Sequence, residues 1–147
     1  MMRMFSRRGF GIQSPWAYSL VRDVLFEPLP YYVFDELRRQ YPRRSRRERQ
    51  ADELLFRLAH YVAPMPLTLV GNFADSTREY MRRGRDAGSV QECDAERVMV
   101  VADISGENHD RWKAIVDDPS ATATFDIRSR FGVAFYKPGF SKQDFKI

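Results

Sequence analysis

The chain has 147 residues, 44% hydrophobic and 14% aromatic, so it can bury a core and does not have a disordered composition. Its formal net charge is +4, and its single cysteine and two histidines exclude an internal disulfide framework and disfavour a zinc site. No apolar run approaches the roughly 20 residues of a membrane span. We therefore expect one cytoplasmic domain, 1–147, with no membrane partner.

The positive charge is concentrated near the start of the chain. Residues 1–49 carry 11 arginines against 5 acidic residues, whereas residues 50–147 carry 13 basic against 15 acidic. Five of these arginines crowd the beginning of a predicted helix: Arg43, Arg44, Arg46, Arg47 and Arg49. Cations at a helix N-terminus oppose the macrodipole, so an acidic partner would relieve the crowding. One hypothesis is that this arginine cluster binds a polyanion such as nucleic acid; the alternative is a solvated helix face.

Residues 1–64 predict a helical segment of three helices, because apolar residues recur at helical spacing between proline and capping signals. The middle helix is expected from about Val33 to Tyr41. The bounding signals are Ser14, Pro15 and Pro28 for the first helix, Pro30 and Pro42 for the second, and Ser45, Glu48 and Pro64 for the third.

Residues 65–147 predict a reduced α/β core. Strands are expected at 67–70, 97–103, 121–127 and 132–137, the last two joined as a hairpin around 128–131, and helices at 74–83 and 107–118. Asp75 or Ser76 would cap the first helix and Gly84 would end it. Residues 89–93 lie too close to the next strand for a parallel crossover, so we favour a loop. The predicted fold is α/β, a small, mostly parallel sheet of about four strands with a terminal antiparallel hairpin and helices on both faces.

Two positions follow predicted strands where ligands of open α/β sheets bind. Gly71 comes after the strand 67–70 and opens a turn of the kind that approaches phosphates or nucleotides, although one glycine also serves as a purely structural turn. Asp103 ends the strand 97–103, with helix capping or a solvated loop position as the alternative role. These two residues are the best polar and turn candidates for a site.

Three stretches, 9–38, 51–77 and 98–147, resemble a class I S-adenosylmethionine-dependent methyltransferase-like family common in Bacteroidetes, with a Rossmann-like fold. They match its basic opening segment with a Ser-Pro-aromatic motif, its lead-in helix with first strand and cofactor loop, and its C-terminal end. Several central strands of the family are missing here. The second glycine of the cofactor loop is also absent, and of the acidic pair after the family's fifth strand only Asp103 remains.

The resemblance implies S-adenosylmethionine as the cofactor, with Gly71, Asn72 and Asp75 facing its methionine end, Glu92 its ribose and Asp103 the substrate. The departures favour a degenerate, non-catalytic binding or interaction protein. An active methyltransferase with a reduced site and a polyanion-binding protein are the alternatives. Lost strands would leave sheet edges uncovered, so we also predict either a homodimer through a sheet edge or helix face, or N-terminal helices that cover the gap.

Overall fold

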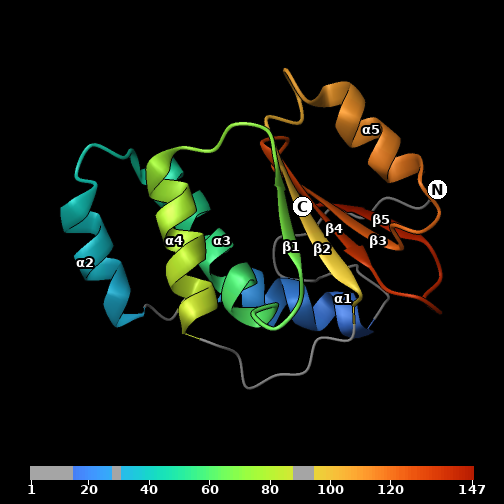
Figure 1. Cartoon of the computed structure of the whole chain (residues 1–147), viewed down its shortest axis with the longest axis horizontal. Coiled ribbons are helices and arrows are strands. Elements are labelled where there is room, and N and C mark those ends of the chain that lie inside the picture. Colours follow the sequence, from blue (N-terminus) through green and yellow to red (C-terminus); the bar gives the residue numbers. More distant parts are fainter. Residues whose placement is uncertain (1–14, 28–30, 88–94) are drawn as a thin grey trace.

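The computed structural model describes residues 15–27, 31–87 and 95–147, and it is an α/β protein (Figure 1). Its helices precede and alternate with the strands of one sheet. The helices are α1 Pro15–Ser19, the π-helical segment η1 Leu20–Leu25, α2 Tyr32–Gln40, α3 Arg46–Tyr61, α4 Asp75–Asp86 and α5 His109–Asp117. The strands are β1 Leu67–Val70, β2 Arg97–Ala102, β3 Ala123–Ile127, β4 Phe131–Tyr136 and β5 Gln143–Lys146.

The sheet has five strands in the order β1-β2-β4-β3-β5. β1 pairs parallel with β2 and β3 parallel with β5, whereas β4 runs antiparallel to both of its neighbours. The predicted hairpin of β3 and β4 is confirmed. The prediction of about four mostly parallel strands is wrong, because the sheet is mixed and β5 adds a strand. β5 has the sequence QDFK, in which Phe145 alone belongs to the residue types that favour strands.

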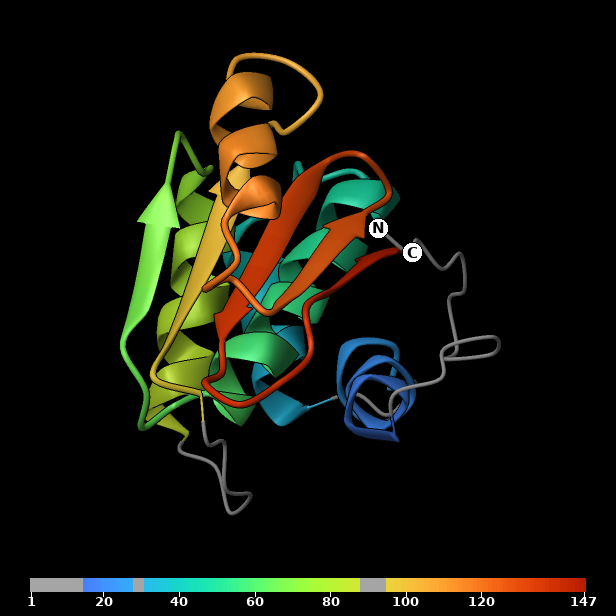
Figure 2. The ribbon, with the colours of Figure 1, turned by 90° about the vertical axis from the view of Figure 1, so that its right-hand side faces the viewer.

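Helices cover both faces of this sheet (Figure 2). One face packs against α1, η1, α3 and α4 in the largest apolar cluster, and Leu55, Phe125 and Phe135 are almost fully buried there. The other face packs against α5 through Trp112, whose ring lies on Gly132 of β4. α2 forms an outer layer, because its Phe34 and Leu37 pack on α3 and α4 rather than on the sheet. In the N-terminal helical segment, α1, η1 and α3 therefore share a core with the strands, whereas α2 does not pack on the sheet.

The three predicted N-terminal helices are confirmed, although Ser14 lies outside the described residues. The capping box of α3 forms as predicted: the Glu48 amide donates to the Ser45 hydroxyl at 3.1 Å and the Ser45 amide donates to the Glu48 carboxylate at 2.9 Å. Residues 88–94 also lie outside the described residues, so the structure does not test the loop predicted at 89–93. Among the described residues no helix is long and apolar enough to cross a membrane.

Two predicted boundaries of α4 are wrong. Ala74 is the N-cap, and neither Asp75 nor Ser76 caps the helix, because both already lie inside it. Gly84 does not end the helix either, since α4 continues to Asp86. Gly84 is buried, and a Cβ there would overlap the carbonyl oxygen of Phe56 in α3. This glycine therefore serves the close crossing of α3 and α4 rather than a stop signal.

Candidate functional site

The predicted cofactor region lies where the parallel strands β1 and β2 end. Gly71 directly follows β1 and has a φ of +93°, and Asp103 directly follows β2 with a φ of +50°. Glycine adopts such a left-handed conformation without steric cost, and aspartate tolerates it better than most residues. As the sequence predicts, Gly71 and Asp103 lie at the carboxyl ends of two neighbouring parallel strands.

The turn at Gly71 is filled by a side chain from the loop after β2. Asn108 is 4% exposed, and its Nδ2 donates to the Ala102 carbonyl at 2.7 Å. A Cβ on Gly71 would overlap this Nδ2, at less than the 3.0 Å that real Cβ atoms keep. The absence of a side chain at Gly71 is therefore explained by Asn108. The two loops pack directly against each other at the point where a nucleotide turn would approach its ligand.

Asp103 is exposed, but its carboxylate is used locally. Its Oδ2 accepts a hydrogen bond from the Glu107 amide at 2.9 Å, and its carbonyl accepts from the amides of Gly106 and Asn108. These contacts shape the loop that leads into α5. The Asp103 carboxylate therefore shapes the loop before α5 and does not cap the helix, whose N-cap is Asn108, and the residue remains exposed to solvent.

Asn72 and Asp75 are exposed beside Gly71, and Glu92 lies outside the described residues. The two residues after Asp75, in the first turn of α4, point inward instead. The hydroxyls of Ser76 and Thr77, both buried, donate to the Asp52 carboxylate of α3 at 2.7 and 2.5 Å. The hydroxyls that follow the predicted cofactor turn thus hold α4 onto α3.

Asp52 is fully buried, and its charge is matched by Arg44 from the predicted arginine cluster. Arg44 donates to both Asp52 oxygens, at 3.1 and 3.0 Å, and to Glu48 at 2.9 Å and Thr77 at 3.2 Å. Because these contacts occupy its guanidinium, Arg44 acts as an internal tie between α3 and α4. The spacing of Arg44, Glu48 and Asp52 at i, i+4 and i+8 was the sequence signal for this network.

The other four arginines of the cluster lie around the first turn of α3. Arg43, Arg46 and Arg47 are exposed, whereas Arg49 is half-buried, and its charge only partly offsets the rise that burial causes in the pKa of Tyr80. Arg47 lines a cavity between α3 and the turn joining β3 to β4. The five predicted arginines therefore lie close together, but Arg44 binds Asp52, Arg47 lines the cavity, and Arg43 and Arg46 are exposed to solvent.

The described residues contain no group of three or more His, Cys, Asp and Glu side chains that could hold a metal ion. Sequence reasoning missed three residues that share the Arg47 cavity: Arg57, Arg128 and Arg130. Arg47, Leu54 and Arg57 recur at i, i+7 and i+10 on one face of α3, which was the available signal. The other two arginines come from a turn more than 70 positions later, which no local pattern links to α3.

No protein-family model, no curated protein and no solved structure matches the chain.

Proposed function

We propose that this chain is a non-catalytic binding protein built on a reduced, methyltransferase-like α/β core. The observation that carries the proposal is the contact of Asn108 with Gly71, because the turn that would hold S-adenosylmethionine is filled by the protein's own side chain. Residues other than Gly71, Asn72, Asp75 and Asp103 line the cavity beside Arg47 and a second cavity beside Pro119.

The geometric demands of methyl transfer also support a non-catalytic role. Transfer from a sulfonium requires donor and acceptor to be held in near-attack geometry by surrounding walls. Here the hydroxyls of Ser76 and Thr77 in α4 donate to Asp52, and the Asp103 carboxylate accepts a hydrogen bond from the Glu107 amide. The side chains left to meet a cofactor at this end of the strands, those of Asn72, Asp75 and Asp103, are exposed to solvent.

A calorimetric titration with S-adenosylmethionine and S-adenosylhomocysteine tests the proposal. We expect no saturable heat up to millimolar ligand. Asn72→Ala and Asp75→Ala are the matched variants, because both residues are exposed and their truncation leaves the core intact. Micromolar binding to the wild-type chain that either variant weakens would contradict the proposal and favour the alternative, an active methyltransferase with a reduced site.

Polyanion binding is the second candidate function, and the exposure of Arg43, Arg46 and Arg47 favours it. Arg44 does not contribute, since Asp52 and Glu48 occupy it. Binding of a single-stranded oligonucleotide through this surface should weaken with salt, with a log-log slope of about −0.7 per phosphate neutralised. Replacing Arg43 and Arg46 by Gln should lower the slope by about one to two. Binding that does not respond to salt would exclude this function.

A further inference from the structure

A cavity of about 550 Å³ opens between the end of η1, the exposed side of α3 and the β3–β4 turn. This volume falls in the range of small-molecule sites, roughly 300 to 1,000 Å³. Its walls come from parts of the chain far apart in sequence, which the core holds in fixed relative positions. The lining residues that matter here are four arginines, which define the arginine pocket: Arg47, Arg57, Arg128 and Arg130.

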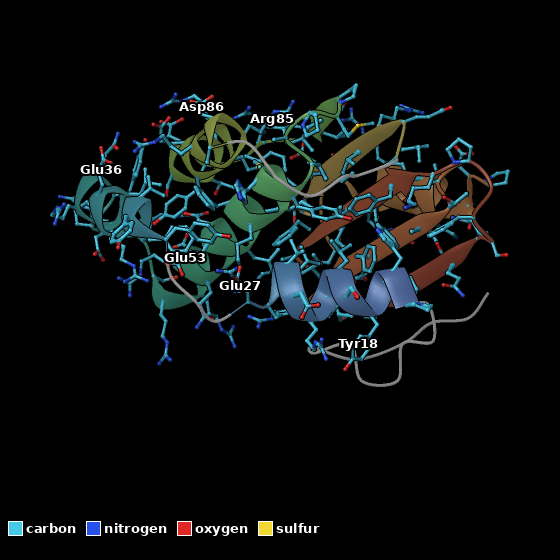
Figure 3. The ribbon with its side chains drawn as sticks, turned by 90° about the horizontal axis from the view of Figure 1, so that it is seen from below. Tyr18, Glu27, Glu36, Glu53, Arg85 and Asp86 are labelled. Carbon is cyan, nitrogen blue, oxygen red and sulfur yellow. The ribbon has the colours of Figure 1, made fainter. Side chains whose placement is uncertain are left out.

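The charge of the arginine pocket is strongly unbalanced. Glu53 is the single acidic residue of its lining, and its carboxylate already accepts two hydrogen bonds from Arg38 of α2, at 2.8 and 3.2 Å. Figure 3 labels Glu53 on α3 and Glu27 just after η1. Because Arg38 neutralises Glu53, the side chains that line the pocket carry a net positive charge.

Arg57 is half-buried, unlike the three other arginines of the pocket, which are exposed. In the part of the chain that the structure describes, its guanidinium donates only to the Leu25 carbonyl, at 3.3 and 3.1 Å. Burial lowers the pKa of Arg57 below its ordinary value, while Glu53 and Glu27 partly raise it. A partly buried cation bonded to a neutral carbonyl gains from an anion that enters the pocket.

The remaining wall of the pocket is apolar. Phe26 is half-buried, and Leu54, Ile127 and Phe131 lie almost fully buried in the same wall. The Arg128 guanidinium lies 5.7 Å from the centre of the Phe26 ring. A bare inorganic ion would leave the exposed part of this ring in contact with water. A ligand with an anionic end and a planar or apolar body would cover both parts of the lining.

We propose that the arginine pocket binds a small phosphomonoester joined to a planar group, of which a mononucleotide is the simplest example. Guanidinium groups match phosphate oxygens in paired hydrogen bonds, and arginines from two elements can surround a tetrahedral dianion. The concave pocket favours one phosphate with its attached ring over an extended strand. The inference goes beyond the proposed function, since it names a ligand class for a site remote from Gly71 and Asp103.

The test is titration calorimetry of the full chain with adenosine 5′-monophosphate and with inorganic phosphate. We expect saturable binding of the nucleotide, tighter than that of phosphate. The variant Arg47→Gln/Arg130→Gln should weaken it by about tenfold or more, since it removes two charged donors. Arg43→Gln/Arg46→Gln loses the same charge outside the pocket lining and should change affinity less than about twofold. Both pairs are exposed, and circular dichroism with a thermal melt verifies folding; Arg130→Gln alone replaces a pair that fails to fold.

Four results would overturn the inference. The first is no saturable binding of either probe at millimolar concentration, and the second is nucleotide binding no tighter than phosphate binding. The third is equal weakening by both double variants, and the fourth is displacement of the nucleotide by an oligonucleotide without terminal phosphate; either of these would point to the polyanion surface. Excess S-adenosylhomocysteine should leave nucleotide binding unchanged, so this experiment and the cofactor titration can fail independently.

Discussion

Arg44, which lies just before the N-cap of α3, forms a two-pronged ion pair with Asp52 of α3, with Nε and Nη2 of the arginine 3.1 and 3.0 Å from the two carboxylate oxygens. Asp52 is fully buried and also accepts hydrogen bonds from the hydroxyls of Ser76 and Thr77. The pair therefore joins the N-terminal part of α3 to the first turn of α4 and binds the hydroxyls that follow the predicted cofactor turn.

Arg44→Met should lower the free energy of unfolding by about 3 to 5 kcal/mol, because it leaves the buried Asp52 carboxylate without its cation. Urea denaturation measures the change. Arg43→Met, at an exposed neighbouring position, should stay within about 0.5 kcal/mol of wild type. A loss below about 1 kcal/mol in Arg44→Met would show that the pair does not hold the two helices together.

Gly84→Ala should destabilise the protein although alanine is the better helix former by about 1 kcal/mol. The added Cβ would overlap the Phe56 carbonyl, a backbone atom that cannot turn aside, so we expect a net loss of about 1 to 3 kcal/mol. Thermal and urea denaturation measure it. Asp86→Ala, near the exposed end of the same helix, is the control and should change stability little. A stabilised Gly84→Ala variant would refute the close crossing of α3 and α4.

Gly71→Ala and Asn108→Ala should be energetically coupled. Gly71→Ala suffers both the positive φ and the overlap with Asn108, and Asn108→Ala removes the overlap at the cost of one buried hydrogen bond, about 1 kcal/mol. In a double-mutant cycle, Gly71→Ala should therefore cost less in the Asn108→Ala background, by roughly 0.5 to 2 kcal/mol. Strict additivity would mean that Asn108 does not fill the Gly71 turn.

Tyr80 should make the protein sensitive to alkaline pH. Burial, followed by the charges of Glu53 and Asp52, raises the pKa of Tyr80 to about 12 from the ordinary 10.0. A raised pKa in the folded state stabilises the fold fully below pH 10.0, and that contribution is lost as pH rises from 10.0 toward about 12. Urea midpoints across this range should fall more steeply for wild type than for Tyr80→Phe.

The same substitution should be tolerated at neutral pH. Among the described residues the Tyr80 hydroxyl has no hydrogen-bond partner, so Tyr80→Phe removes an unsatisfied polar group rather than a bond. We expect the free energy of unfolding at pH 7 to stay equal or to rise by up to about 1 kcal/mol. A loss of more than about 1 kcal/mol, or alkaline curves that superimpose, would contradict this environment for Tyr80.

Local signals predicted the elements whose partners are close in sequence. Ser45 and Glu48 formed the capping box, and the β-rich runs on either side of 128–130 formed the hairpin, because each requires only neighbours. Gly84 was misread as a stop because its reason is a tertiary one, the Phe56 carbonyl of another helix.

β5 was missed for a related reason. Gln143–Lys146 has little strand propensity. Its buried Asp144 accepts hydrogen bonds from the neighbouring Lys142 and from the Thr124 hydroxyl, and the second contact exists only after β3 and β5 pair. The candidate sites divide in the same way. Gly71 and Asp103 could be placed at the end of parallel strands from pattern alone, whereas Asn108 and the arginine pocket depend on how separate loops meet.

The most direct test of the central claim, that the ends of β1 and β2 are closed against a cofactor, is a ¹⁵N–¹H NMR titration with S-adenosylhomocysteine. The backbone amides report each loop separately, so no mutation of the tightly packed Gly71 is needed. Millimolar ligand should leave the amide signals of residues 70–77 and 102–109 at their chemical shifts in the free protein. Saturable shifts confined to these two loops would contradict it and restore the methyltransferase alternative.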